Sequence, residues 1–148
     1  MTTPIIPVYA TNVTKTGANS IANNAYANSA DALRIQRSAL TVAALLCDFR
    51  LTSVTFGTAP VGGCLQLAIV DRDASGNIGP TPSATLVPTK LITLGPLPAA
   101  SNASTGWIMG ADAVSIPPDC DVWLFNNGTA FSLSSGWVLT AMPWSPGT

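Results

Sequence analysis

Short runs of alternating apolar and polar residues dominate the chain from residue 49 onward, and clusters of turn residues separate them. Within residues 65–70, Leu65, Leu67 and Ile69 fall on one face of an extended backbone, which is the period of a β-strand. Further strands are predicted at residues 49–56, 84–87, 91–94, 106–109, 114–116, 121–126, 129–133 and 136–142. About eight to ten short strands with frequent turns predict an all-β fold, an antiparallel β-sandwich of the jelly-roll type.

The same pattern predicts where strands break. In residues 49–56 the apolar phase slips between Leu51 and Val54, which predicts a bulge near Ser53. Asn127 and Gly128 stand between two alternating runs and accept the positive φ angles of a type I′ turn, so they predict a hairpin. Residues 71–82 consist mostly of turn residues and are expected to form a loop.

Residues 29–46 allow two interpretations. Ser29 is able to cap a helix, whereas Leu33 and Ile35 alternate with polar neighbours as they would in a strand. The apolar run that follows, residues 39–46, fits a buried strand. We expect two strands here rather than one helix.

The first thirty residues differ from the rest, because Thr, Asn, Ala and Ser dominate them and Pro4 and Pro7 frame a short apolar patch. Prolines at this spacing favour an extended backbone that does not close a normal strand ladder. We therefore expect an extended N-terminal arm over residues 1–30 and a sandwich domain over residues 31–148. An arm that reaches a neighbour, an arm folded back on its own domain and a disordered tail all remain open.

The composition is unusual mainly in its low content of charged residues. Charged residues make up 9% of the chain, against a usual share of about 25%, and the net charge is −1. Weak repulsion between copies suits close packing in an assembly. The six Lys and Arg residues are dispersed, so a nucleic-acid partner is not expected. The longest apolar run is too short to span a membrane, and the first residues lack the features of a secretion signal.

The residue types that carry most catalysis are scarce. The chain has no histidine, so Ser-His and Cys-His nucleophiles are excluded, and its seven acidic residues are all aspartates in mainly turn-like contexts. Paired aspartates can hydrolyse a glycoside, but turn or cap roles are the expectation. We therefore expect no catalytic residue, no cofactor and no enzyme activity.

Two patterns resemble metal or disulfide chemistry without completing it. Residues 71–77 reproduce the opening of an EF-hand loop, but Pro82 stands where that loop needs its bidentate Glu, so an ordinary Asx turn is expected and no metal site. The three cysteines, Cys47, Cys64 and Cys120, form no CxxC pair and are expected to be free, buried thiols.

Aromatic residues suggest where contacts are made. Trp123 and Trp137 stand inside strand patterns and are expected in the core or on a sheet face. Trp144 lies in the C-terminal tail and is the expected exposed anchor of an interface. Together with the apolar patch of the arm, the interface candidates are Ile5, Ile6, Val8, Tyr9 and Trp144.

Between residues 51 and 133 the order of segments is an opening strand LTSVTF, a turn of small residues, the strand LQLAIVDRD, the loop SGNIGPTPSATLV, the pair Gly106 and Trp107, and the strand DVWLFNNG. This order resembles β-sandwich domains of bacteriophage virion proteins, namely tail fibres, head fibres and capsid decoration or cement proteins. The resemblance implies a fold and a context, and it carries no catalytic residue.

The function that the resemblance implies is that of a non-enzymatic virion structural protein, above all a capsid decoration or cement protein. Such a protein would be made in the host cytoplasm, would sit on the capsid surface or tail, and would bind the major capsid protein or other virion proteins. We expect it to form a homo-oligomer, with a trimer favoured. The alternative is a receptor- or glycan-binding module of a tail or head fibre, in which Trp107 would lie in an open site.

Overall fold

The computed structural model describes residues 6–41, 43–88, 90–98, 102–103 and 108–147. Two 3₁₀ turns, η1 (Ser29–Asp31) and η2 (Arg37–Ala39), accompany the strands. In this part of the chain no helix has the length and apolar character needed to cross a bilayer. The strands are β1 (Pro7–Tyr9), β2 (Val13–Thr16), β3 (Ala25–Tyr26), β4 (Leu33–Gln36), β5 (Leu46–Thr52), β6 (Val54–Thr55), β7 (Cys64–Asp71), β8 (Lys90–Thr93), β9 (Asn102–Ala103), β10 (Met109–Ser115), β11 (Asp119–Asn127) and β12 (Val138–Pro146).

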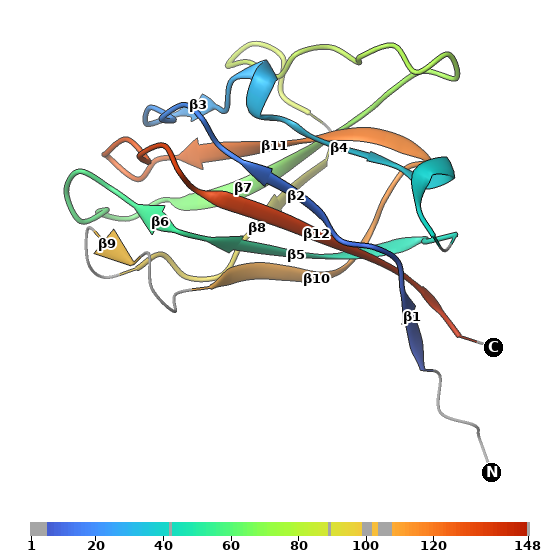
Figure 1. The fold of residues 1–148 in the computed structure, drawn as a ribbon. Helices are drawn as coiled ribbons and strands as arrows, with labels where there is room; N and C mark the ends of the chain where they lie inside the picture. The colour runs from blue at the N-terminus through green and yellow to red at the C-terminus, as the bar shows by residue number, and fades with distance from the viewer. Residues whose placement is uncertain (1–5, 42, 89, 99–101, 104–107, 148) are drawn as a thin grey trace.

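Two antiparallel sheets form the body of the molecule (Figure 1). The first sheet has the order β1-β12-β5-β10, with β2 also paired to β12, and the second has the order β3-β11-β7-β8, with β4 also paired to β11. A small third sheet joins β6 and β9. The predicted antiparallel β-sandwich is confirmed, while the jelly-roll connectivity stays a prediction.

The core lies between the two sheets because alternate residues of each long strand point inward. In β5, Cys47, Phe49 and Leu51 are fully buried, and in β7, Leu65 and Leu67 are as well. The two-residue period of the sequence therefore identified the buried face of these strands. Burial of such side chains from both sheets is the main source of stability in a fold of this kind.

At Ser53, where a bulge was expected, the strand is interrupted. Ser53 has φ +57°, β5 ends at Thr52, and β6 begins at Val54. Leu51 and Val54 are both fully buried, because the positive φ angle shifts the side-chain alternation by one residue.

The hairpin predicted at Asn127 and Gly128 is wrong. β11 does end at Asn127, but the next strand, β12, belongs to the other sheet. The intervening residue Leu133 forms only isolated bridges with Ile21 and Phe56. A buried amide favours this crossing, since Asn126 donates to the carbonyls of Ile21 at 3.0 Å and of residue 131 at 2.9 Å.

Two apolar runs that resemble strands in the sequence are not strands. Residues 33–36 form β4 as expected. The run 39–46 begins at the last residue of η2, and only its final residue, Leu46, belongs to a strand, β5. Residues 84–87 lie in the long loop between β7 and β8, where Pro82 and Pro88 flank them. Each proline lacks the N–H that a ladder needs, so this segment stays outside both sheets.

The arm is shorter than expected. β2 pairs with β12, β3 pairs with β11, and Ile21 lies in the core, so residues 10–30 belong largely to the sandwich. Only the segment before Ala10 leaves the body (Figure 1). The predicted boundary at residue 30 is therefore too late in the chain, because the polar composition of residues 10–30 hid their short strands.

Candidate functional site

The N-terminal and C-terminal segments meet in a two-stranded ribbon at one end of the sandwich. β1 is antiparallel to the end of β12, with Tyr9 opposite Trp144, Val8 opposite Ser145 and Pro7 opposite Pro146. On the other side of β12, the last residue that pairs with β5 is Trp144, opposite Leu46. Ser145 and Pro146 therefore pair with β1 alone. The Gly147 N–H also donates to the Ile6 carbonyl at 2.9 Å, so we call the segments 6–9 and 144–147 the ribbon, and Figure 1 shows them leaving the body side by side.

This pairing brings the predicted interface residues together. Ile6, Val8 and Tyr9 belong to the predicted apolar patch of the arm and Trp144 comes from the tail, and the sequence did not predict that the arm and the tail meet. Ile5, also predicted, lies outside the described residues. The structure thus gathers four of the five predicted positions in one place.

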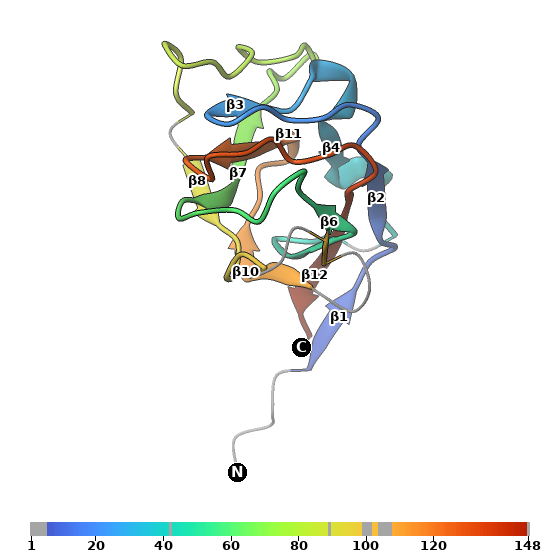
Figure 2. The same cartoon turned by 90° about the vertical axis from the view of Figure 1, so that its left-hand side faces the viewer.

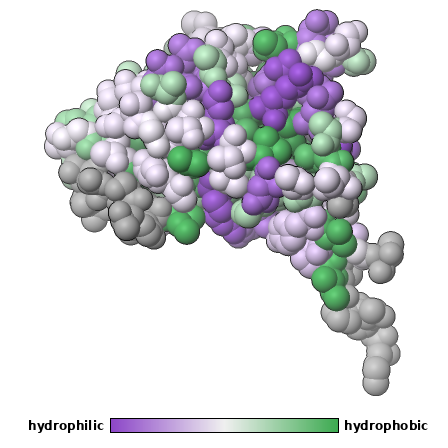
Figure 3. Space-filling model, viewed as in Figure 1, coloured by the Kyte–Doolittle hydropathy of each residue, from purple (hydrophilic) through white to green (hydrophobic). Residues whose placement is uncertain are grey.

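Exposed apolar side chains characterise the ribbon. Ile6 is 69% exposed and Val8 is 43% exposed. At the base of the ribbon Leu45 adds a further exposed apolar side chain, and its N–H donates to the carbonyl of Trp144 at 3.2 Å. Figure 3 shows apolar colour where the ribbon leaves the body. Surfaces of this kind mark contact sites when they are contiguous.

Besides the backbone pairing of Trp144 with Leu46, one buried carboxylate, that of Asp48 in β5, holds the ribbon to the body. Asp48 accepts hydrogen bonds from the Ala113 N–H at 2.8 Å, from Trp144 Nε1 at 3.0 Å and from the Tyr9 hydroxyl at 3.1 Å. The rings of Tyr9 and Trp144 stand 6.3 Å apart between centroids. One carboxylate therefore fixes an arm residue and a tail residue at the same point.

The hydrogen bonds also set the charge of this carboxylate. Burial by itself raises the pKa of Asp48, but the hydrogen bonds from Ala113, Trp144 and Tyr9 outweigh it and hold the pKa below its usual range. Asp48 is thus ionised at neutral pH and is a strong acceptor. The same contact acts on its partner, because accepting by Asp48 raises the pKa of the Tyr9 hydroxyl.

Trp144 differs from the exposed anchor that the sequence predicted. Its ring is partly buried, and its indole N–H is bound by Asp48 of the same chain. The more exposed members of the ribbon are Ile6 and Val8. Asp48 itself was missed by sequence reasoning, because an aspartate between Cys47 and Phe49 reads as an outward-facing strand residue.

The two other described tryptophans are not exposed. Trp123 and Trp137 are buried, as their strand patterns predicted. Trp107, on which the glycan-binding alternative depended, lies outside the described residues.

The aspartate loop after β7 is closed on itself. Asp73 accepts from the backbone N–H groups of Ser75 at 2.9 Å and Asn77 at 2.8 Å, and from the Asn77 side chain at 2.7 Å. The predicted Asx turn is therefore present, and its own loop uses the carboxylate oxygens that a calcium ion would need. Among the residues that the structure describes, no group of three or more Cys, His or acidic side chains is placed to hold a metal ion.

Several other aspartates are also engaged. Asp31 is buried and accepts from the N–H groups of Ala18 and Asn19, both at 3.0 Å. Asp119 pairs with Arg34 at 2.7 Å, and a further pair joins Arg72 to Asp121 at 2.9 Å. These carboxylates act in turns and ion pairs within the fold rather than as solvated caps alone.

Comparison of the chain with family models, with curated proteins and with solved structures gave no match. The expected resemblance to phage virion proteins therefore stays a prediction from the order of sequence segments.

Proposed function

We propose that this chain is a non-enzymatic structural subunit of a phage particle, a capsid decoration or cement protein, whose ribbon makes the contacts. The observation that carries the proposal is the ribbon itself, an apolar two-stranded extension at one end of the sandwich. Its partners would be the major capsid protein or other virion proteins, on the capsid surface or tail. The same proposal includes self-association, with a trimer favoured.

The ribbon backbone needs little further ordering when it binds a partner. Asp48 holds both strands through Tyr9 and Trp144, so the backbone that would enter an interface is already fixed. Preorganisation of this kind reduces the entropy lost on binding. Burial of an Ile or Val side chain contributes about 1.5–3 kcal/mol, and repetition over many copies makes such modest contacts decisive.

Low charge supports the same proposal. The exposed residues of the ribbon, Ile6 to Tyr9, carry no charge, and the whole chain has a net charge of −1. Copies packed side by side on a shell therefore repel one another weakly. A contact made by apolar side chains is also expected to depend little on salt, in contrast to one made by ion pairs.

The test replaces Ile6 and Val8 by Asp and measures co-sedimentation with particles that were assembled without this chain. Val61→Asp is the matched control, because Val61 is 71% exposed and lies in the loop after β6, away from the ribbon. We expect the double variant to lose particle binding and the control to retain it. Retained binding by the double variant, with an unchanged circular dichroism spectrum, contradicts the proposal.

A further inference from the structure

The pair Asn127–Gly128, at the end of β11, is a chemically reactive point of the chain. It is the one asparagine followed by glycine in the sequence. Glycine has no side chain to hinder its backbone nitrogen, so that nitrogen approaches the side chain of the preceding asparagine more easily than the nitrogen of any other residue would. Gly128 is exposed and Asn127 is half-buried, so water reaches the pair.

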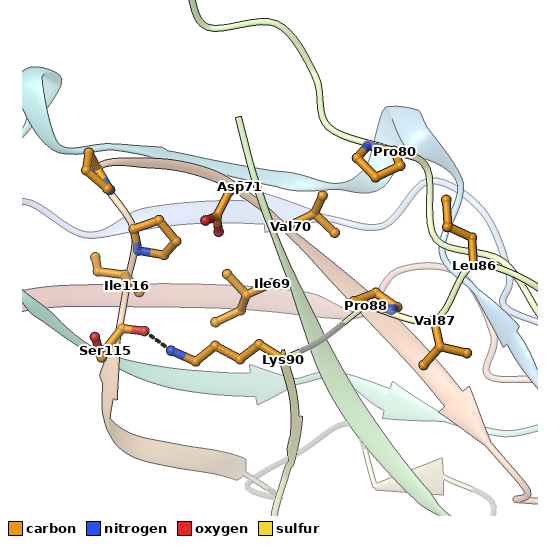
Figure 4. A pocket seen from close by; sticks show the side chains of 12 residues that line it. Ile69, Val70, Asp71, Pro80, Leu86, Val87, Pro88, Lys90, Ser115 and Ile116 are labelled. Atoms are coloured by element: carbon orange, nitrogen blue, oxygen red, sulfur yellow. Dashed lines mark hydrogen bonds between the residues drawn. The ribbon is translucent and has the colours of Figure 1, made fainter. Parts of the chain in front are cut away.

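The pair is remote from the surfaces described so far. Figure 1 shows the end of β11 and the ribbon at opposite ends of the sandwich. A groove of about 750 Å³, lined by Asp71 and Lys90 among others, is also distant (Figure 4). Asp71 is the last residue of β7, whereas Asn127 pairs with the first, Cys64. Chemistry at Asn127 is therefore independent of the proposed function.

The reaction open to such a pair is loss of the side-chain amide through a cyclic imide. The Gly128 nitrogen gives up its proton and bonds to Cγ of Asn127, the bond between Cγ and Nδ2 breaks, and ammonia leaves. Water then opens the ring at either of its carbonyls, which gives aspartate or isoaspartate. The only co-reactant is water, and a higher pH accelerates the first step because the backbone N–H must lose its proton.

The fold holds Asn127 away from this reaction. In the pairing of β11 with β7 it stands opposite Cys64, and its Nδ2 donates to Oε1 of Gln66 at 3.0 Å. Ring closure requires the backbone at Asn127 to leave the extended conformation of the ladder and the side chain to turn toward Gly128. The bond to Gln66 must break for this turn, and it involves the nitrogen that leaves as ammonia.

Asn24 holds the attacking nitrogen. It has φ +58° and directly precedes β3, which pairs with β11 and lies beside it in Figure 2. The Oδ1 atom of Asn24 accepts a hydrogen bond from the Gly128 N–H at 2.9 Å. Loss of the proton from Gly128 would leave its nitrogen facing the Asn24 oxygen with no proton between them, which is unfavourable.

We infer that Asn127 is a modification site of this chain, at which the amide is lost through a cyclic imide with Gly128, and that Gln66 and Asn24 set the rate in the folded protein. One hydrogen bond corresponds to about a two- to tenfold change in an equilibrium. With both bonds to break, the folded chain is expected to react at least about fivefold more slowly than the chain unfolded in urea.

The products change the local structure. Aspartate at position 127 has no donor for Gln66 and adds a negative charge to a chain whose net charge is −1. Isoaspartate inserts an extra carbon into the backbone between the residue opposite Cys64 and the residue bound by Asn24. Either product therefore loosens the end of β11.

The experiment incubates the full chain at mildly alkaline pH, folded and in urea, and follows each asparagine by mass spectrometry of its peptides. Replacement of NH₂ by OH marks the modified residue, and a methyltransferase specific for isoaspartate labels the second product. Asn127 is expected to be the first asparagine modified. Asn127→Gln is the control without the reaction, because its ring would have six members and forms far more slowly.

Two pairs of variants test the restraints. Gln66→Leu removes the acceptor of the Asn127 amide, whereas Gln66→Glu keeps an acceptor oxygen; both lose the donor to Thr93. Asn24→Ala removes the acceptor of the Gly128 N–H, whereas Asn24→Asp keeps one. Each acceptor-free variant is expected to accelerate the folded-state reaction about two- to tenfold, and its partner to remain close to wild type.

A circular dichroism spectrum and a urea midpoint for every variant show that the compared proteins are folded. Asn24→Ala places alanine at a positive φ angle, so the Gln66 pair decides the test if that variant unfolds. The inference is overturned if another asparagine is modified first, or if the folded wild type reacts as fast as the chain in urea. Folded Gln66→Leu that reacts at the wild-type rate overturns the assigned role of Gln66.

Discussion

Removal of the Asp48 carboxylate is expected to detach the ribbon from the body and to destabilise the fold. In Asp48→Ala the Ala113 N–H and the Trp144 indole N–H lose their acceptor, at 2.8 and 3.0 Å. Hydrogen bonds to a charged group contribute about 1.5–3 kcal/mol each, but both donors lie near the surface, where water replaces part of the loss. Tyr9 is half-exposed and is left out of the sum for the same reason. We expect a loss of about 2–3 kcal/mol in the free energy of unfolding.

The loss of stability in Asp48→Ala is expected to depend on pH. A carboxylate whose folded pKa is lowered stabilises the fold above its unfolded pKa, about 3.9, and loses that contribution as pH falls through the folded pKa. The difference between wild type and Asp48→Ala is therefore full at neutral pH and shrinks below about pH 4. Asp48→Asn keeps one acceptor oxygen but no charge, so its deficit relative to wild type should be smaller at neutral pH and should also shrink as the wild-type Asp48 becomes protonated.

Urea unfolding followed by tryptophan fluorescence measures these differences. A slope of about 1–3 kcal/mol per molar urea converts the expected loss into a midpoint shift of about 0.7–3 M. Asp112→Ala is the matched control, because Asp112 is largely exposed and its pair with Arg50 is a surface ion pair worth less than about 1 kcal/mol. In a double-mutant cycle, Trp144→Phe should cost little once Asp48 is already Ala.

Two outcomes refute this reasoning. If Asp48→Ala unfolds at the wild-type urea midpoint at pH 7, the Asp48 carboxylate does not contribute to the free energy of unfolding. A deficit of unchanged size at pH 2.5 assigns the loss to the missing side-chain volume and not to the charge.

Three further predictions concern other parts of the molecule. Only Cys64 is expected to react with a thiol reagent in the native protein, because burial raises the pKa of the other two thiols to about 12; a count of three before denaturation contradicts this. Gly17→Ala should lower the melting temperature, since an added Cβ would lie 2.0 Å from the Trp137 ring, whereas Gly57→Ala, with open space around it, should not. Calcium should leave the melting temperature unchanged, because Asp73 is already bound within its loop, and a calcium-dependent rise would show that the loop opens.

Much of the fold follows from local alternation. β5 buries its apolar residues in a two-residue period, which was enough to locate it. β7 and β11 bury both faces over part of their length, because a second cluster of Ala68, Val70 and Trp123 lies on their outer face. The wrong strand predictions fall on apolar segments that lie outside the sheets. Leu86 and Val87 have strand-like character, but prolines on both sides keep them out of a sheet and leave them at the edge of a groove.

The site was predictable only in part, since its members are distant in the sequence. Composition and proline spacing identified Ile6, Val8 and Tyr9, and position in the tail identified Trp144. That these residues meet depends on a register between segments more than a hundred residues apart, which no local pattern encodes. The carboxylate that fixes the register, Asp48, looks like any polar residue on the outer face of a strand.

Pro7, one of the two prolines that made the arm look unable to pair, is placed so that the ladder loses nothing. The N–H of Gly147 donates to Ile6 and the N–H of Ala10 donates to Pro143, so every second residue of the arm bonds to β12 and Pro7 lies between them. Pro7 therefore turns its missing N–H away from β12, toward the open edge. An edge with a proline at that position is a poor template for another strand. A partner of the ribbon is thus expected to bind its side chains and not its backbone.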